Sequence, residues 1–388
     1  MVTKRFDAII IGAGVQGAST AFHLSHAGLT RILVLDELEA AGRGSSGRSG
    51  SMLMKSRENR TKIEFSKYSY DWLHRFSEHF AEPLSFRKTG FLSLVPETLR
   101  ERYLEEHHIR LECGVPSQII DTADIQSLSP AVLTDGIEFG VLGPDDGVID
   151  PDQLVQGYLR VAGERGTQTR LLQRVVGIDS GPGDLVRVGT TTDRYEAHIV
   201  VNAAGAGAAE ISQMVAAPIP IRSLRRSLFF VEASDPRLQI GPMVEESGVE
   251  WYYRGLGEGR VLIGMGLESD GGASDSPDLE FWDSVHTVAT HRVPALADAR
   301  VYGGTSGLRP LTPDILPIIG PVPGVPGFYL NCGWGGEGIM HSPAGGRMTA
   351  DSITGSTTGD LDWTSCRVDR FAEPETLVHH NTTEGAHQ

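Results

Sequence analysis

The stretch FDAIIIGAGVQGASTAFHLSHAGLTRILVLDE, residues 6–37, decides the fold of this chain. It begins with an apolar, strand-type run at 8–11 and closes with a second apolar run at 32–35 that stops at Asp36. Between the runs lies a helical stretch that opens with three glycines in GxGxxG spacing, Gly12, Gly14 and Gly17. A strand, glycine turn, helix and strand with an acidic end form the complete context of a dinucleotide-binding fingerprint.

Each position of this fingerprint has a physical role. Gly12 permits the tight turn, Gly14 lets the backbone approach a pyrophosphate, and Gly17 lets helix and strand pack closely. We expect the phosphates at the helix N-terminus, where N–H groups and the helix dipole favour negative charge. Asp36 is expected to accept hydrogen bonds from a ribose and would repel a 2′-phosphate. The alternative is a glycine turn that holds no ligand.

Composition places the chain among ordinary globular proteins. Its 388 residues allow two domains or one elaborate domain, and hydrophobic residues make up 40% of them and charged residues 22%. The formal net charge of −16 disfavours binding to nucleic acid or to anionic membranes, which needs a basic surface. No apolar run approaches the length of a membrane-spanning helix, and Asp7 interrupts the N-terminal run, so we expect neither a membrane span nor a signal peptide.

The three cysteines, Cys113, Cys332 and Cys366, form no CxxC pair. An odd number without such a pair argues for a reducing compartment, and against a zinc site or a disulfide reductase. We therefore expect a cytoplasmic protein that binds no metal.

A second glycine-rich segment lies at 333–338, in GWGGEG. A strand-type run at 328–331 precedes it, and Ser342 with Pro343 opens a helix that ends near Gly355. A glycine loop that leads into a helix N-terminus is again an anion site. A nicotinamide dehydrogenase with one dinucleotide unit has no use for it, whereas a flavin does, because the reduced ring carries negative charge at its pyrimidine end. The alternative is a loop that only makes a tight turn.

The middle of the chain has a different pattern. Strands are expected at 171–178 and 197–202. Between residues 218 and 266, strand-type runs are joined by glycine-rich turns without helices, which indicates an antiparallel sheet. The nucleotide-binding domain is therefore expected to be interrupted by a β-rich insertion.

With these blocks in place, the chain resembles the D-amino acid oxidase superfamily of FAD enzymes, which includes glycine oxidase, sarcosine oxidase and related amine dehydrogenases. The resemblance covers residues 6–355 and rests on blocks in the family's order: IIIGAGVQGAS, ILVLDE, GSSGRSGS, DGVIDP, VVNAAG, GLRPLTPDILPIIGP and GWGGEGIMHSPA. The last block is most similar to the branch of the sarcosine oxidase β-subunit and the sarcosine and dimethylglycine dehydrogenases. The resemblance implies oxidation of the C–N bond of an amino acid or N-methyl amino acid by hydride transfer to flavin, followed by hydrolysis of the imine.

The expected fold is α/β, with a discontinuous Rossmann-like FAD-binding domain and an inserted substrate domain rich in antiparallel β-structure. The expected bounds are 1–84, 148–216 and 304–370 for the FAD-binding domain, 85–147 and 217–303 for the substrate domain, and 371–388 for a disordered tail.

The resemblance also implies which residues hold FAD: Gly12, Gly14, Gly17, Asp36, Ser45, Ser46, Arg48, Val175, Gly205, Gly336, Gly338 and Ile339. Ser45, Ser46 and Arg48 would lie along the phosphates and the flavin. Val175 would meet the adenine through its backbone, and Gly205 would close that side. The three residues of the second glycine segment would lie near the pyrimidine end of the ring. For Arg48 the alternative is a solvated loop arginine.

Two residues are implied in catalysis through substrate binding. Arg309, in GLRP, matches the arginine that grips the substrate carboxylate in glycine and D-amino acid oxidases, and its planar fork suits a carboxylate. The alternative is an internal ion pair. Tyr252, in EWYYRG, matches a tyrosine over the flavin, whereas Trp251 and Tyr253 point to the opposite face of the strand. His341 could act near the flavin, with a helix-capping or surface role as the alternative.

The chain departs from the family pattern in three places. GGTSGLRPLTPD lacks the cysteine that tethers flavin in monomeric sarcosine oxidase, so we expect non-covalent FAD, with Cys332 a buried bystander. RVLIGMG lacks the lysine that promotes the reaction with oxygen, and Met340 replaces a second lysine. Oxygen, a quinone and an electron-transfer protein or partner subunit all stay open as electron acceptors, and so does homo- or hetero-oligomeric assembly.

Three other functions stay open. A carboxylate clamp would serve a 2-hydroxy acid equally well. A non-catalytic flavoprotein subunit or assembly factor would keep the flavin but not the reaction. An NAD dehydrogenase would not contain flavin at all.

Overall fold

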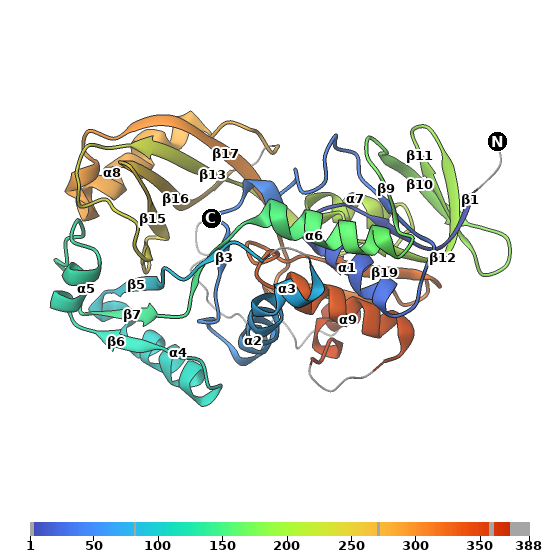
Figure 1. Ribbon diagram of the computed structural model, residues 1–388, viewed down its shortest axis with the longest axis horizontal. Helices are drawn as coiled ribbons and strands as arrows, with labels where there is room; N and C mark the ends of the chain where they lie inside the picture. Colours follow the sequence, from blue (N-terminus) through green and yellow to red (C-terminus); the bar gives the residue numbers. More distant parts are fainter. Residues whose placement is uncertain (1–3, 81–82, 270–271, 357–360, 373–388) are drawn as a thin grey trace.

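The computed structural model describes residues 4–80, 83–269, 272–356 and 361–372. In these residues the chain forms two eight-stranded sheets and a small three-stranded one. Figure 1 shows the two large sheets side by side, each with its own helices. The expected α/β class with an antiparallel insertion is confirmed. The expected tail lies, from residue 373 on, outside the described residues.

The first sheet contains the N-terminal fingerprint. Its strands run in the order β10-β11-β12-β1-β2-β9, with β19 beside β12 and β18 beside β19. Their bounds are β1 (Lys4–Ile11), β2 (Ile32–Leu35), β9 (Gln168–Arg170), β10 (Val175–Ser180), β11 (Val186–Thr190), β12 (Arg194–Asn202), β18 (Ile318–Pro321) and β19 (Phe328–Cys332). β1 pairs in parallel with β2 and β12. Its second half, residues 8–11, is apolar because alternate residues, such as Ile9 and Ile10, pack into separate cores on the two faces of the sheet.

One expected strand of this sheet was placed too early. The strand predicted at 171–178 begins only at Val175, because Leu172 adopts a positive φ of 56° in the preceding turn. Strand β11, which pairs antiparallel with β10 and β12, was not foreseen. Its sequence, VRVGT, alternates buried and half-buried residues, but the run is only five residues long.

Helices cover both faces of the first sheet: α1 (Val15–His26), α2 (Arg60–His74), α3 (Phe76–His79), α6 (Pro151–Glu164), α7 (Ala208–Gln213) and α9 (Ser342–Thr354). α1 and α9 approach closely, since a Cβ at Gly346 would lie 2.7 Å from the carbonyl carbon of Ser19. The Ser19 hydroxyl also donates to the carbonyl of Ser342 over 2.6 Å. As the sequence predicted, α9 ends at Gly355, which has a φ of 71°.

The second sheet runs in the order β17-β13-β16-β15-β14-β5-β7-β6. Its bounds are β5 (Phe91–Val95), β6 (Gln118–Ile120), β7 (Phe139–Gly143), β13 (Arg222–Glu232), β14 (Met243–Glu246), β15 (Trp251–Gly257), β16 (Arg260–Ser269) and β17 (Arg300–Leu311). All neighbours are antiparallel except β14 and β5. Trp251 and Tyr253 lie in the core of this sheet, on the face opposite Tyr252. Because β17 runs past residue 304, the second sheet crosses one expected domain boundary, and the boundaries stay a prediction.

The remaining elements are short. α4 (Arg100–Glu112), α5 (Thr122–Leu128) and α8 (Trp282–Arg292) cover the second sheet, and β3 (Met52–Leu53), β4 (Phe86–Arg87) and β8 (Gly147–Ile149) form the third. Single 3₁₀ turns are η1 (Ser46–Arg48), η2 (Glu97–Leu99), η3 (Gly205–Gly207), η4 (Leu279–Phe281), η5 (Pro294–Leu296), η6 (Thr364–Cys366) and η7 (Val368–Ala372). In the part of the chain that the structure describes, no helix combines the length and apolarity needed to cross a bilayer.

Candidate active site

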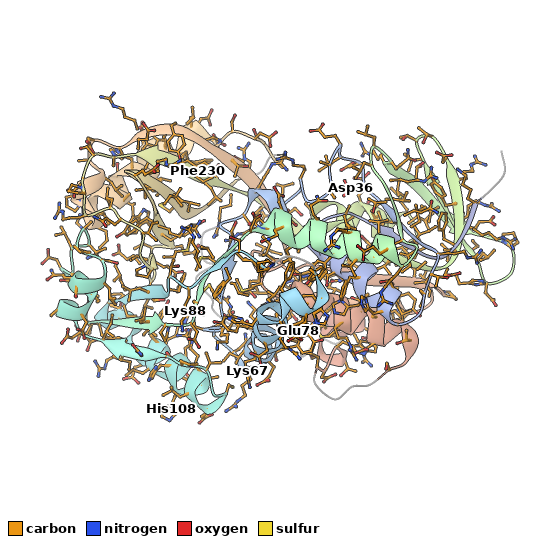
Figure 2. The ribbon with its side chains drawn as sticks, viewed as in Figure 1. Asp36, Lys67, Glu78, Lys88, His108 and Phe230 are labelled. Atoms are coloured by element: carbon orange, nitrogen blue, oxygen red, sulfur yellow. The ribbon has the colours of Figure 1, made fainter. Side chains whose placement is uncertain are left out.

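A cavity of about 530 Å³ lies where the first and second sheets meet. Its wall includes every predicted site residue except Gly17: Gly12, Gly14, Asp36, Ser45, Ser46, Arg48, Val175, Gly205, Tyr252, Arg309, Gly336, Gly338 and Ile339. Figure 2 labels Asp36 in the lobe of the first sheet and Phe230, on β13, in the lobe of the second. The predicted residues of the wall come from both ends of the sequence, from Gly12 to Ile339, and share one cavity.

The N-terminal loop is shaped by contacts that exclude side chains. Gly12 has a φ of +108°, and a Cβ there would collide with the carbonyl oxygen of Ala203 on the neighbouring segment. A Cβ at Gly17 would collide with the carbonyl oxygen of Gly12. Gly17 thus has the packing role that the sequence predicted, and it takes no part in the cavity wall.

The first turn of α1 faces the cavity. No side chain caps the helix at Gly14, and Val15 and Gln16 line the wall. The Val15 amide donates to the hydroxyl of Ser46 over 3.1 Å. A helix N-terminus open to a cavity attracts negative charge, which fits a phosphate there.

Asp36 closes the same end of the cavity. Its carboxylate accepts from the amides of Ala13, at 2.6 Å, and Leu38, at 2.8 Å. Burial raises the pKa of Asp36 above its ordinary value, and the two amides oppose that shift. The side chain is thus fixed between β2 and the glycine loop, in position to accept from a ribose.

Three wall glycines differ from Gly12 and Gly17, because no protein side chain or backbone crowds them. A Cβ at Gly14 or Gly338 would make only ordinary contacts at 3.5 Å, and one at Gly205 would have no atom within 4 Å. Bare backbone at these positions leaves room for a ligand to approach closely. The cavity therefore fits an extended ligand that touches both glycine loops, as FAD would.

Charged side chains line both halves of the cavity. The carboxylates of the wall, Asp36, Glu37 and Glu210, all come from segments of the first sheet. The second sheet contributes Arg226, on β13, and Arg309, on β17. Arg48 and Arg174 also line the wall, and Arg226 pairs with Glu250 at 3.5 Å, so cations belong to both halves of the cavity.

Glycines make room for the large side chains of that half. The Tyr252 ring lies over Gly264, its partner on β16, where a Cβ would overlap the phenol. The Arg309 guanidinium lies against Gly336, where a Cβ would come within 2.8 Å of its Cζ atom. Strand β15 therefore places the Tyr252 ring, and strand β17 the Arg309 guanidinium, at the same cavity as the C-terminal loop.

Arg48 is not the solvated loop arginine considered as its alternative. Its side chain is only 15% exposed and pairs with Asp275 over 2.8 Å, while it also donates to the carbonyl of Gly44. The pair connects the loop after β2 to the segment before α8.

The C-terminal loop contributes to the cavity in a different way from the one expected. Gly336, Gly338 and Ile339 line the wall, but the first turn of α9 does not. The Ala344 amide in that turn donates instead to the hydroxyl of Ser69 on α2, over 3.3 Å. The first turn of α9 is therefore not part of the wall, whereas the backbone of the loop itself is, and the action of the helix terminus on the flavin stays a prediction.

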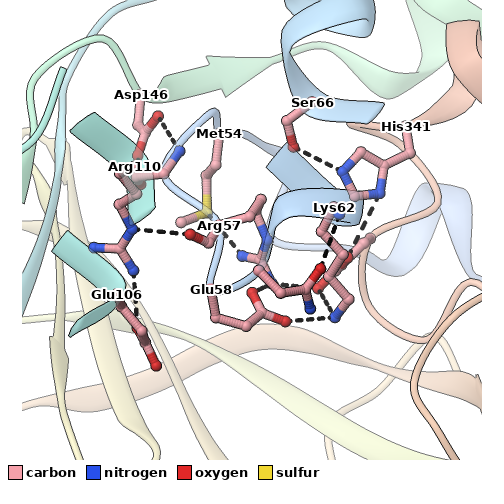
Figure 3. A network of polar contacts seen from close by, with 12 residues as sticks. Met54, Arg57, Glu58, Lys62, Ser66, Glu106, Arg110, Asp146 and His341 are labelled. Atoms are coloured by element: carbon pink, nitrogen blue, oxygen red, sulfur yellow. Dashed lines mark hydrogen bonds and ion pairs between the residues drawn. The ribbon is translucent and has the colours of Figure 1, made fainter. Parts of the chain in front are cut away.

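Behind this loop lies a buried charge cluster, consisting of Arg57, Glu58, Lys62, Glu337 and His341 (Figure 3). Lys62, on α2, is 4% exposed and contacts Glu58 at 2.6 Å and Glu337 at 2.9 Å. Arg57 pairs with both carboxylates as well. Burial opposes ionisation of Glu337, but Arg57 and Lys62 outweigh it and hold the pKa of Glu337 below its ordinary value.

His341 belongs to this cluster and occupies the N-cap position of α9, although its side chain makes no capping hydrogen bond. A surface role is wrong, because the residue is buried. Burial lowers its pKa to about 4, and the ring is therefore neutral near pH 7. Nε2 lies 2.8 Å from the Ser66 hydroxyl, and Nδ1 lies 3.5 Å from a carboxylate oxygen of Glu337. Its side chain does not line the cavity.

The sequence did not predict Gln16, Arg226 or the charge cluster. Gln16 lies inside the GAGVQG motif, and its amide nitrogen donates to the carbonyl of Gly338 over 2.8 Å, which joins the two loops. The polar side chain of Gln16, in the first turn of a helix that is otherwise apolar there, was the sequence feature that could have indicated this contact. Arg57 and Glu337 carry no local signal, because 280 positions separate them.

The family profile described as DAO, FAD dependent oxidoreductase, matches residues 7–352. The chain belongs to this family. It is therefore an FAD-dependent oxidoreductase, as the sequence predicted. In the described residues, no group of three or more His, Cys, Asp or Glu side chains could hold a metal ion.

Known proteins are similar along nearly the whole chain. The β-subunit of sarcosine oxidase from Arthrobacter sp. is 24% identical over 99% of this chain and 95% of its own length. 4-Methylaminobutanoate oxidase (formaldehyde-forming) from Paenarthrobacter nicotinovorans is 26% identical over 94% of this chain, which spans only 45% of that protein. The crystal structure of L-proline dehydrogenase from P. horikoshii has a TM-score of 0.86 at 24% identity, with 96% of this chain and 99% of that one covered. At this identity, the structural similarity establishes the fold.

Proposed function

We propose that this oxidoreductase oxidises the C–N bond of an amino acid or N-methyl amino acid, giving an imine that water hydrolyses. The arrangement of Arg309 beside the C-terminal loop in one cavity supports this proposal. The names of similar proteins, an oxidase of a methylamino acid and a sarcosine oxidase subunit, point to the same substrate class.

The cofactor would extend between the two glycine loops. The first turn of α1, with Ser46, would bind the pyrophosphate, and Asp36 would bind the ribose. Gly336 and Gly338 would lie at the ring. FAD bound in this way supplies a two-electron acceptor for hydride. The described wall includes Cys332, but burial raises the pKa of its thiol to about 12, which supports non-covalent binding.

Arg309 would bind the substrate carboxylate. A guanidinium donates two parallel, charge-assisted hydrogen bonds to a carboxylate, which fixes its orientation as well as its position. A substrate held in this way would present its Cα hydrogen to the side of the cavity proposed for the flavin. Such orientation of the reacting groups by itself lowers the activation barrier substantially. Tyr252 and Leu228, from the same sheet, would exclude water from that region.

The first experiment asks what reduces the flavin. We expect anaerobic addition of N-methyl, D- or L-amino acids to bleach the visible flavin bands, and 2-hydroxy acids to leave them unchanged. Bleaching by hydroxy acids alone would assign the other substrate class. If neither class bleaches the bound flavin, the protein is a non-catalytic flavoprotein. Reoxidation in air, with a quinone or with an electron-transfer protein then identifies the acceptor.

The second experiment tests the carboxylate clamp. Arg309→Ala is expected to raise KM for carboxylate substrates about 100-fold or more while FAD stays bound, because a charge-assisted, bidentate contact is lost. Arg309→Lys should recover only part of the affinity, since an ammonium lacks the fork. Arg300→Ala, at the exposed end of the same strand, is the matched control and should behave as wild type. Unchanged kinetics of Arg309→Ala would remove the assignment.

A further inference from the structure

The C-terminal loop is rich in glycine, and its last four residues contain a single side chain that can anchor them. Residues 335–338 read Gly-Gly-Glu-Gly, so Glu337 alone carries a side chain. Glycine loses more conformational freedom on folding than any other residue, which makes such a segment costly to order. The ends of the loop are held by backbone groups, since the Gly335 amide donates to the carbonyl of Pro310 over 2.9 Å and the Gly338 carbonyl accepts from Gln16 over 2.8 Å. Between these two contacts, the only side chain of the segment that can fix it is Glu337.

The contacts of Glu337 all lead away from the cavity, toward α2. Its carboxylate pairs with Lys62 over 2.9 Å and with Arg57, and it lies 3.5 Å from Nδ1 of His341. The flanking glycines, Gly336 and Gly338, face the opposite way and form the cavity wall. Glu337 therefore connects two parts of the site. Its carboxylate belongs to the ion pairs on one side of the loop, and its two neighbouring glycines belong to the cavity wall on the other side.

The arrangement of charge makes this anchor specific. Two cations, Arg57 and Lys62, are matched by two carboxylates, Glu58 and Glu337 (Figure 3). Removing one member of a buried pair leaves the opposite charge uncompensated, so the cluster strongly favours the loop position that brings Glu337 to the cations. The Arg309 guanidinium packs on Gly336, so it depends on the same loop position.

We propose that Glu337 is a positioning residue, whose buried ion pairs with Arg57 and Lys62 hold Gly336 and Gly338 against the flavin ring and beneath Arg309. The proposal rests on the placement of the flavin given above. Glu337 itself touches neither cofactor nor substrate in this arrangement. It acts by removing the freedom of a glycine-rich wall.

The structure offers a matched pair of variants. Glu337→Gln and Glu58→Gln remove the same charge from the same two cations, but only Glu337 belongs to the loop. We expect Glu337→Gln to raise the dissociation constant of FAD at least 10-fold and to change the visible absorption and circular dichroism of bound flavin. Glu58→Gln should destabilise the apoprotein to a similar degree and leave FAD affinity within about 2-fold of wild type.

Two further measurements separate the possible outcomes. If Glu337→Gln fails to fold, Lys62→Met keeps the Arg57–Glu337 pair and should weaken FAD binding in the same direction but less.

Gly338→Ala adds a methyl group to the wall and reports whether the flavin lies there. If Glu337→Gln and Glu58→Gln change the dissociation constant of FAD equally, while Gly338→Ala changes the flavin spectrum, the anchoring role alone is overturned. No spectral change in either Gly338→Ala or Glu337→Gln would overturn the placement of the flavin as well.

Discussion

The two glycine loops that meet at the cavity are held in place by different forces. The N-terminal loop is fixed by its own backbone, since Gly12 and Gly17 sit where any side chain would collide with a carbonyl oxygen. The C-terminal loop is fixed by side chains, through Glu337 and a buried charge cluster. The first loop presents a helix terminus to the cavity, whereas the helix after the second loop turns its terminus to α2.

This difference shows that similar glycine motifs can have different physical causes. In the N-terminal loop, the glycines are required by sterics, and the loop should resist changes in solvent conditions. In the C-terminal loop, Gly333 and Gly335 have positive φ, but Gly336 and Gly338 flank a charged anchor, so this part of the loop should respond to pH and to changes of charge.

Gly17→Ala is expected to have the largest effect, because its Cβ would collide with a backbone atom that cannot move without opening the turn. We expect the free energy of unfolding of the apoprotein to fall by about 3 kcal/mol, measured in urea, and FAD to be lost on purification. Gly14→Ala is the control, since its Cβ would make an ordinary contact at 3.5 Å. It should unfold like wild type while binding FAD more weakly. Wild-type stability of Gly17→Ala would contradict the steric explanation.

Acid should destabilise the protein through His341, in the same direction as through His23 on α1, whose pKa burial lowers to about 3. Burial lowers the pKa of His341 from 6.5 to about 4, so between these values the unfolded chain binds a proton that the folded chain does not. Stability from this group is complete above pH 6.5 and is lost as the pH falls toward 4, by about 2 kcal/mol at pH 5. His341→Gln should reduce the difference between urea midpoints at pH 7 and pH 5. An unchanged difference would show that His341 does not titrate in this way.

Gln16→Ala should have the smallest effect, because it removes one hydrogen bond between the two loops. We expect FAD to bind about 5-fold more weakly, equivalent to about 1 kcal/mol, in titrations followed by flavin fluorescence. Ser25→Ala is the control, since that buried hydroxyl bonds only to Phe22 of its own helix. Equal FAD affinity of the two variants would show that the loops are positioned independently.

The sequence predicted those parts of the molecule that depend on neighbours along the chain. Strand β1, the turn at Gly12 and the C-cap at Gly355 follow from local patterning and backbone conformation. The cavity residues were predicted largely through resemblance to a family, and the structure brings them together. The contact of the Ala344 amide with Ser69 was not predicted, because Ser69 comes from a distant helix.

The same limit explains why the charge cluster was not foreseen. A glutamate between glycines and a lysine on an amphipathic helix look like ordinary solvated side chains in the sequence. Only the tertiary packing of α2 against the C-terminal loop makes Lys62 and Glu337 partners, 275 positions apart. Long-range pairing of charges leaves no period or spacing to detect.

The position of Ile339 near the end of the chain has a consequence for biosynthesis. The residues that would bind the pyrophosphate leave the ribosome early, but the opposite wall of the cavity is translated only after the whole second sheet. The nascent chain would therefore be unable to enclose the isoalloxazine until the second sheet and the C-terminal loop have both been translated.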